Sequence, residues 1–344
     1  MKYSKKEITR AGNIIMSSKN EDERNYALLK INDWRTNHLQ PLRVFKRRLI
    51  KQLEIKQIEV YLISQRLKRL TSIEYKLDLN PTMGLGGMQD IGGFRAVLKD
   101  VKDLKKLKLI LEKEKPKYRA ERMTDYVSSP KSSGYRSIHY IYKYKSSVKK
   151  YDNLKVELQI RTRLQHNWAT AVETAGIITK TSLKSSKGPD EWLEFFKIVS
   201  SLFAIKEKLP VLDEHKNMRM EDLMIECYKM SKKMNIIETL KALKVTTEHL
   251  ENKKFPGDYY LMHINLESKI VSLKEFSKSQ FQIATERYLE IEKEIDNMKN
   301  AVVLVSASSF KNLKKAYPSY FLDTTDFLNA LEKINSNCEL LKLV

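Results

Sequence analysis

Hydrophobic residues in the first 78 positions recur at spacings of three and four, a pattern typical of amphipathic helices. The clearest stripe consists of Leu42, Phe45, Leu49 and Leu53. Lysine and arginine dominate the other faces after residue 40. We therefore predict that residues 1–78 are helical and that the basic residues at the end of this stretch lie on one helix.

Short apolar runs replace this pattern after residues 81–93, where one proline and five glycines would break a helix. Three strands and two helices are predicted beyond the break, at residues 94–98, 135–144 and 155–161 and at residues 101–114 and 164–175. The C-terminal part begins with helices over 191–250. Period-two alternation starts at Tyr259, and Ala301–Val305 is a short apolar strand.

These elements predict an α/β (α+β) protein with a mixed β-sheet flanked by helices. We expect four parts: an N-terminal helical region over 1–40, an α/β domain over 41–180, a linker over 181–190, and a C-terminal helical and small α/β domain over 191–344. The length of 344 residues agrees with about two domains.

Composition narrows the class of protein. Hydrophobic residues make up 42% of the chain, which supports a sizeable core and excludes a disordered or collagen-like protein. The sequence contains no apolar run of membrane-spanning length and only two cysteines, so we expect a cytoplasmic protein in a reducing compartment, with no membrane partner. The net charge of +21 favours polyanionic partners, or it simply keeps the protein soluble.

The strand VELQIR carries the sharpest chemical signal. Its three apolar residues alternate with Glu157, Gln159 and Arg161, which therefore share the opposite face. A carboxylate, an amide and a cation in a row can bind a metal–phosphate substrate. The alternative is an ordinary half-exposed strand with a polar outer face.

A second acid, Asp90, lies in the glycine-rich approach to the strand that contains Arg95. Asp90 and Glu157 would form a carboxylate pair from two strand ends, a common way to hold Mg²⁺ on a triphosphate. The loop 131–137 offers two cations and an aromatic ring, which suits a base stacked on Tyr135 with phosphates on the cations.

Four stretches together resemble the synthetase domain of the RelA/SpoT family, which makes the alarmone nucleotides (p)ppGpp. They are RLKRLTSIEYK (66–76), DIGGFR (90–95), PKSSGYRSIH (130–139) and VELQIRTRLQHNWA (156–169). They follow the order found in the family and cover about residues 40–180. The resemblance implies a nucleotidyltransferase-like fold for the domain over 41–180.

The resemblance also implies roles for the donor side of the site. Arg66 and Arg95 match the arginines that sandwich the adenine of ATP. Asp90 matches the Mg²⁺ ligand, and Glu157 matches the acid that aids Mg²⁺ binding and activates the acceptor hydroxyl. The positions that contact the ATP phosphates are matched by Lys68, Ser72 and Lys76.

On the acceptor side, Tyr135 matches the ring on which the acceptor base stacks. Supporting acceptor or phosphate positions are matched by Lys131, Arg136, His139 and Gln159. Ser133 stands where many members carry asparagine, so the choice of acceptor could differ. The sequence has no His-Asp dipeptide, so we expect no metal-dependent hydrolase activity toward the product.

The reaction implied is transfer of pyrophosphate from ATP to a ribose 3′-hydroxyl with Mg²⁺ as cofactor. The first candidate acceptor is GDP or GTP, as in the stringent response. The second is the 3′-CCA end of tRNA, as in toxic relatives whose C-terminal domain restrains the enzyme until a protein effector, such as a phage protein, binds. A third hypothesis, an inactive RNA-binding module, disagrees with the complete set of site residues.

Overall fold

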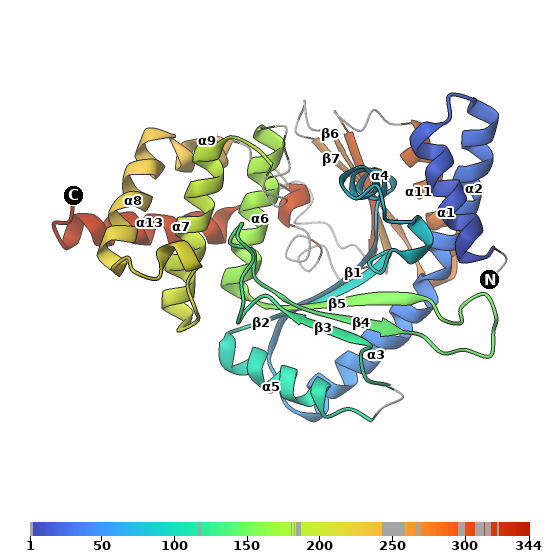
Figure 1. Ribbon diagram of the computed structural model, residues 1–344, viewed down its shortest axis with the longest axis horizontal. Coiled ribbons are helices and arrows are strands. Elements are labelled where there is room, and N and C mark those ends of the chain that lie inside the picture. The colour runs from blue at the N-terminus through green and yellow to red at the C-terminus, as the bar shows by residue number, and fades with distance from the viewer. Residues whose placement is uncertain are drawn as a thin grey trace.

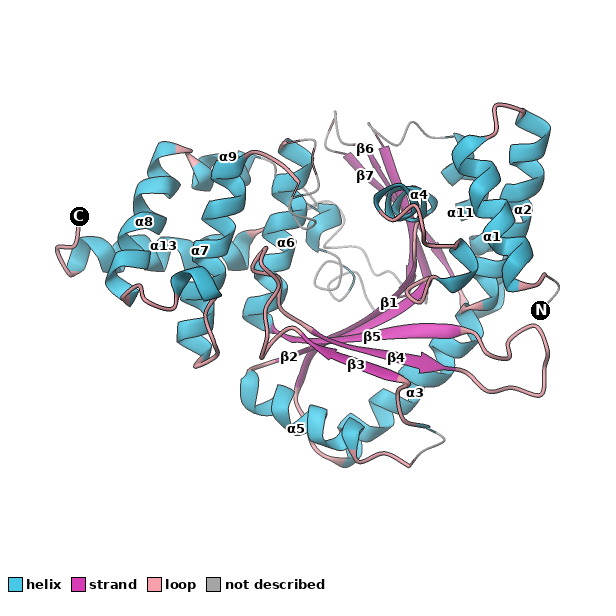
Figure 2. Ribbon diagram, viewed as in Figure 1, coloured by secondary structure: helices cyan, strands magenta, loops and turns pink. Residues whose placement is uncertain are grey.

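A mixed sheet of eight strands runs through the centre of the molecule in a computed structural model (Figure 1). The strand order is β3-β4-β5-β2-β1-β8-β6-β7, and all adjacent pairs are antiparallel except β2 with β5. Helices flank this sheet (Figure 2), which confirms the predicted fold class. The structure describes residues 3–115, 118–179, 181, 183, 187–242, 259–265, 268, 270–294, 300–306, 313, 318–321 and 323–344.

The N-terminal part contains three helices, as its periodicity predicts, but the helical stretch ends earlier than expected. The helices are α1 (Lys5–Ser17), α2 (Glu21–Asn37) and α3 (Leu39–Ile55). A strand, β1 (Val60–Leu67), then pairs along its length with β2 (Gly92–Leu98) before helix α4 (Leu70–Leu79) begins. The prediction of continuous helix was therefore wrong here.

The predicted strands and helices of the central part are present. After β2 come α5 (Val101–Glu112), β4 (Ile138–Lys143), β5 (Lys155–Thr162) and α6 (Arg163–Ile178). One strand, β3 (Arg122–Asp125), was not predicted, since its sequence is short and half-exposed. Helices α3 and α5 cover one face of the sheet, and a core of leucines and of apolar strand residues lies between them (Figure 1).

A helical bundle packs against α6 at the other end of the molecule. It consists of α7 (Asp190–Glu207), α8 (Met220–Lys233), α9 (Ile236–Ala242) and α13 (Thr325–Leu340). Trp168 of α6 is buried in this core and donates its indole N–H to the carbonyl of Phe196 at 2.8 Å. The last helix of the chain, α13, therefore packs against helices from the middle of the sequence, α6 and α8.

The C-terminal strands extend the central sheet rather than forming a separate one. They are β6 (Tyr259–Asn265), β7 (Ile270–Phe276) and β8 (Asn300–Ser306), and helix α11 (Phe281–Glu294) packs on them. The link is the pairing of β8 with β1, at Val305 opposite Arg66. The predicted linker lies partly outside the described residues, and the division into domains stays a prediction.

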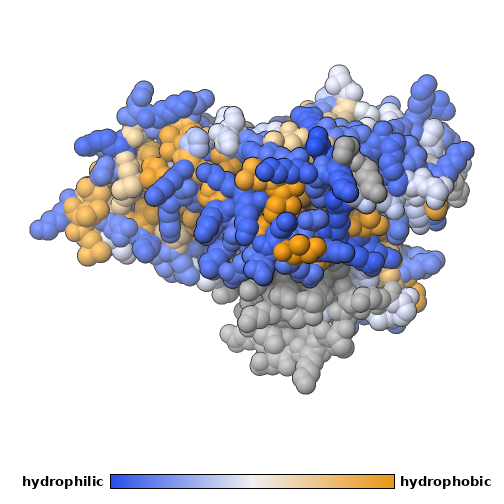
Figure 3. Space-filling view, turned by 90° about the horizontal axis from the view of Figure 1, so that it is seen from below, coloured by the Kyte–Doolittle hydropathy of each residue, from blue (hydrophilic) through white to orange (hydrophobic). Residues whose placement is uncertain are grey.

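Charged and polar side chains dominate the face formed by α3 and α5. Seen from that side, the surface is mostly hydrophilic, with hydrophobic patches between the polar side chains (Figure 3). No helix among the described residues is both long and apolar enough to cross a membrane.

Candidate active site

A cleft opens on the face of the sheet that α3 and α5 leave uncovered, above β1, β2 and β5. The register places Arg66 opposite Gly93, and Gly93 opposite Glu157. A Cβ atom at Gly93 would meet nothing within 4 Å. There is therefore open space above Gly93, between the side chains of Arg66 and Glu157 on the neighbouring strands. Arg95 and Gln159 form the next row of the same face.

The alternation of β5 explains why its polar residues face this cleft. Val156, Leu158 and Ile160 are all buried in the core under the sheet, as the sequence predicts. Successive side chains of a strand point to opposite faces, so Glu157 and Gln159 line the cleft. The alternative of an ordinary solvated strand face does not describe these two side chains.

Asp90 is held between two lysines at the edge of the cleft. Its Oδ2 lies 2.9 Å from Lys68 Nζ, and its Oδ1 lies 2.8 Å from Lys76 Nζ. Burial would raise the pKa of Asp90, but the two ammonium groups lower it to about 2. Burial also lowers the pKa of Lys68, although Asp90 opposes this shift. Asp90 is therefore ionised at neutral pH, beside two lysine ammonium groups.

The carboxylates suit a hard cation only together with further oxygen ligands. Asp90 and Glu157 line the same cleft. The described residues contain no group of three or more His, Cys, Asp or Glu side chains that could hold a metal ion. Because Mg²⁺ is usually bound by one or two carboxylates together with substrate phosphates, this donor set fits a nucleotide-bound Mg²⁺.

Glu157 belongs to a chain of hydrogen bonds that leads away from the cleft. Its Oε1 lies 2.9 Å from His139 Nδ1, and its Oε2 accepts a 2.7 Å hydrogen bond from Gln159. Burial would raise the pKa of Glu157, but the contact with His139 brings it below its ordinary value, although the charge of Asp90 opposes this shift. Burial works against protonation of His139, yet Tyr135 and Glu157 raise its pKa.

The basic residues near the cleft lie on a strand and a helix, not on one helix. Arg66 lies on β1, Lys68 follows that strand, and Ser72 and Lys76 lie on α4. Val60, Tyr61 and Ile63 are β-branched or aromatic, which suits a strand, and β1 pairs with β2 along its whole length. Arg66 and Lys68 line the cleft, whereas Lys76 reaches it through Asp90.

Tyr135 does not have the position expected of a stacking platform. Only 3% of its surface is exposed, and its ring packs in the core that includes Trp168. Its hydroxyl lies 2.9 Å from His139 Nε2, and its ring meets the edge of Tyr126. In this conformation the ring is covered, with Lys131 Nζ 5.6 Å from its centre, and Tyr135 is linked to Glu157 through His139. Its expected stacking role stays a prediction.

The two cations of the same loop also differ from expectation. Arg136 is buried and donates hydrogen bonds to Ser200 Oγ at 3.2 Å and to the Val127 carbonyl at 3.3 Å. Burial lowers the pKa of Arg136 to about 10. These hydrogen bonds hold the loop against α7, and the acceptor-side role of Arg136 stays a prediction. Lys131 is exposed, with its Nζ 4.7 Å from the centre of the Tyr126 ring.

Helix α6 contributes three cleft residues that the sequence reasoning did not identify. They are His166, Thr170 and Glu173. Their spacing of four and three places them on one face of a helix, which is the signal that could have found them. Behind them, Arg161 is fully buried and its Nη2 lies 2.6 Å from His166 Nδ1. Burial and the nearby Arg95 lower the pKa of Arg161 to about 9.

Residues 65–183 match the family model described as the region found in RelA / SpoT proteins. The chain is 31% identical over 126 residues to the GTP pyrophosphokinase YjbM of Bacillus subtilis (strain 168). That match covers 36% of this chain and 59% of the relative, so the chain spans about three fifths of its length.

Two solved structures are similar to part of this chain. A GTP pyrophosphokinase family protein from Streptococcus pneumoniae is 24% identical, with a TM-score of 0.42 over 56% of this chain and 94% of that one. Small alarmone synthetase 1 from Bacillus subtilis, bound to its product pppGpp, is 24% identical, with a TM-score of 0.40 over 49% of this chain and 86% of that one.

Proposed function

We propose that the protein, whose residues 65–183 match the family model of the region found in RelA / SpoT proteins, transfers pyrophosphate from ATP to the ribose 3′-hydroxyl of GDP or GTP and releases AMP. The observation that carries this proposal is the cleft itself. Two acids, Asp90 and Glu157, line it together with Arg66 and Arg95, from three neighbouring strands and the loop before one of them.

On the donor side, Arg66 and Arg95 hold the adenine, and Lys68 and Lys76 hold the phosphates. These lysines now neutralise Asp90, so an incoming triphosphate replaces the carboxylate as their partner and leaves Asp90 for Mg²⁺. Mg²⁺, held by Asp90 and Glu157, would supply charge neutralisation at the phosphates. Fixing both substrates in line is a large part of the catalysis of phosphoryl-type transfer.

On the acceptor side, Glu157 accepts the proton of the 3′-hydroxyl. The hydroxyl oxygen then forms a bond to the β-phosphorus of ATP. The bond between the β-phosphorus and the bridging oxygen of the α-phosphate breaks, and AMP leaves with the electron pair. Gln159 and His139 orient the Glu157 carboxylate through the hydrogen bonds at its two oxygens.

The test uses ATP labelled at the γ-phosphate with GDP, GTP or bulk tRNA as acceptor. Label on GDP or GTP supports the proposal. Label on tRNA alone overturns this choice of acceptor, and label on none of them in the presence of Mg²⁺ overturns the activity.

A second candidate acceptor is the 3′ end of tRNA, with an enzyme that its C-terminal part restrains until a protein effector binds. One observation favours it. Pro318, from the C-terminal 3₁₀ helix η6 (Pro318–Phe321), lines the cleft beside the donor-side residues.

This candidate predicts that loosening the C-terminal segment increases activity. Pro318→Ala should increase the rate of label transfer to tRNA and make expression of the chain more toxic to growth. Pro210→Ala, at an exposed loop position outside the cleft, is the matched control. An unchanged rate for Pro318→Ala would refute restraint at this position.

A further inference from the structure

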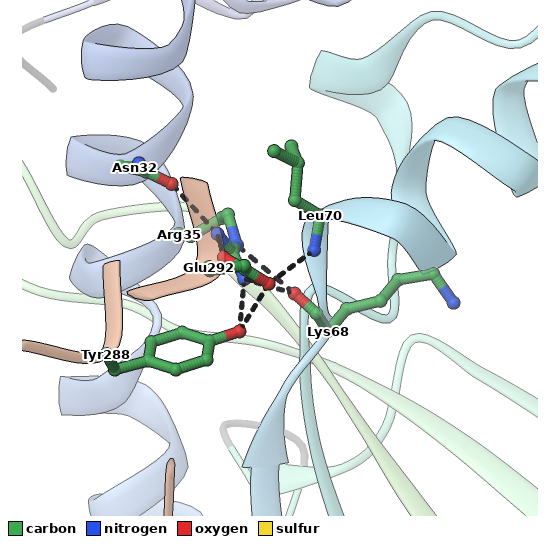
Figure 4. Close-up of polar contacts among 6 residues, drawn as sticks. All are labelled: Asn32, Arg35, Lys68, Leu70, Tyr288 and Glu292. Atoms are coloured by element: carbon green, nitrogen blue, oxygen red, sulfur yellow. Dashed lines mark hydrogen bonds and ion pairs between the residues drawn. The ribbon is translucent and has the colours of Figure 1, made fainter. Parts of the chain in front are cut away.

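A buried polar cluster joins helix α2, near the N-terminus, to helix α11 of the C-terminal part, next to the backbone that leads from Lys68 into α4 (Figure 4). Arg35 of α2 forms an ion pair with Glu292 of α11, with Nη1 2.7 Å from Oε2. The hydroxyl of Tyr288 accepts from Arg35 Nη2 at 2.8 Å and donates to Glu292 Oε1 at 2.6 Å. Asn32 Oδ1 accepts a further 2.8 Å hydrogen bond from Arg35.

This cluster forms hydrogen bonds with two backbone groups between β1 and α4, the carbonyl of Lys68 and the amide of Leu70. Arg35 donates to the carbonyl of Lys68 from Nε at 3.1 Å and from Nη2 at 2.9 Å. Glu292 Oε1 accepts a 2.9 Å hydrogen bond from the amide of Leu70, the first residue of α4. The preceding residue, Arg69, makes no side-chain cap there, so Glu292 supplies the acceptor that the helix start needs.

The side chains that this backbone carries are those that face Asp90. Lys68 is held at its carbonyl by Arg35 while its Nζ lies 2.9 Å from Asp90. Helix α4, which begins at the amide bound by Glu292, carries Lys76 to the other oxygen of Asp90. Movement of residues 68–70 would therefore displace both lysines.

The burial of the cluster argues against a merely structural link. Arg35 is fully buried, and Tyr288 and Glu292 are nearly so. Packing two helices together does not require charge, because apolar residues of similar volume usually do so equally well or better. Burial works against the charge of Arg35, but Tyr288 and Glu292 raise its pKa above the ordinary value. What the charged groups add is directed hydrogen bonding to two particular backbone atoms.

We propose that Arg35 and Glu292 are positioning residues for the nucleotide site, which fix the carbonyl of Lys68 and the amide of Leu70 so that the phosphate-binding lysines face Asp90. This inference rests on the proposed function, since it concerns the same donor site. Both residues lie outside the segment 65–183 that matches the family model.

The experiment compares Glu292→Gln with a matched control, Glu114→Gln. Glu114 also forms a mostly buried ion pair with an arginine, Arg48, at 2.8 Å, but this pair lies on the opposite face of the sheet with α3 and α5. Binding of a non-hydrolysable ATP analogue with Mg²⁺ is measured by calorimetry, and hydrogen exchange is measured over residues 68–76. Neither readout requires turnover.

We expect Glu292→Gln to raise the Kd of the ATP analogue at least fivefold, to leave the Kd of GDP unchanged, and to speed exchange at residues 68–76. Glu114→Gln should change neither Kd more than twofold. Equal ATP affinity in Glu292→Gln and wild type, or an equal loss in Glu114→Gln, overturns the inference. If Glu292→Gln does not fold, Tyr288→Phe removes one hydrogen bond to Glu292 and should raise the Kd at least twofold; an unchanged Kd overturns the inference.

The two proposals fail in different ways. A wild-type protein that binds no ATP analogue would overturn the proposed function, and the positioning role with it. A wild-type protein that binds and transfers pyrophosphate, beside a folded Glu292→Gln protein that binds equally well, would overturn only the positioning role.

Discussion

His139 Nδ1 lies 2.9 Å from Glu157 Oε1, so the acid in the cleft is oriented from the neighbouring strand. The contact lowers the pKa of Glu157 and raises that of His139, against the effect of burial in each case. A charge-assisted hydrogen bond of this kind keeps the carboxylate ionised and limits its rotation.

Replacing Glu157 by glutamine should abolish most of the activity. The amide keeps the size of the side chain but accepts no proton from a hydroxyl, and loss of a general base costs about 100-fold to 10 000-fold in rate. The measurement is the initial rate of label transfer from ATP. Glu121→Gln is the control, since Glu121 pairs with Lys143 and Lys155 outside the cleft. Full activity in Glu157→Gln would refute the catalytic assignment.

The pair should stabilise the fold most between the ordinary pKa values of its members, 4.5 and 6.5. The pKa of Glu157 is lowered, so its contribution is present above 4.5 and is lost as pH falls through the folded value. The pKa of His139 is raised, so its contribution is present below 6.5 and is lost as pH rises through the folded value.

Urea unfolding of wild type and His139→Gln at about pH 5.5 and about pH 8.5 tests this pH dependence. The substitution should cost more free energy of unfolding at the lower pH. An equal cost at both values would show that the pair does not titrate in this way.

Asp90→Asn should weaken nucleotide binding and remove part of the acid sensitivity of the fold. The pKa of Asp90 is lowered from 3.8 to about 2, so its contribution is present above 3.8 and is lost as pH falls toward the lower value. At neutral pH the substitution should cost at most about 2 kcal/mol. Unfolding at neutral pH and at about pH 3 measures this cost, which should shrink in acid. A larger cost in acid would contradict the assignment.

Adjacent glycines at the start of β2 should respond differently to a larger residue. A side chain at Gly93 enters open space between Arg66 and Glu157, so Gly93→Val should fold normally but bind ATP weakly. A Cβ at Gly92 would lie 3.0 Å from Leu42 in the core, so Gly92→Val should cost about 1–3 kcal/mol in stability. Thermal unfolding and binding of an ATP analogue separate the two effects. Normal ATP binding by Gly93→Val would place the nucleotide elsewhere.

Local sequence predicted those parts of the fold whose burial follows a simple period. The alternation of Val156, Leu158 and Ile160 correctly indicated which face of β5 is buried. The prediction from local sequence failed at β1. The spacing of basic residues from residue 66 onward resembles that of a helix, whereas the strand depends on a partner strand about thirty residues away. Short-range patterns do not contain that partner.

The acceptor side of the site shows the same limit. The motif around Tyr135 suggested an exposed ring, but its environment is set by α7, which begins more than fifty residues later. Likewise, nothing near Lys68 in the sequence indicates that Arg35 and Glu292 bind its backbone region. The local sequence shows which chemical groups these residues carry, whereas the orientation of their side chains depends on distant segments.

The pairing of β8 with β1 has a practical consequence for shortened forms of this protein. A chain that ends before residue 190 would lack β8, so one edge of β1 would have no partner strand. It would also lack the bundle helices that cover the apolar surface of α6. Open strand edges and bare apolar surface both promote aggregation. Truncation is therefore a poor way to isolate residues 41–180, and insolubility of such a fragment would say nothing about inhibition.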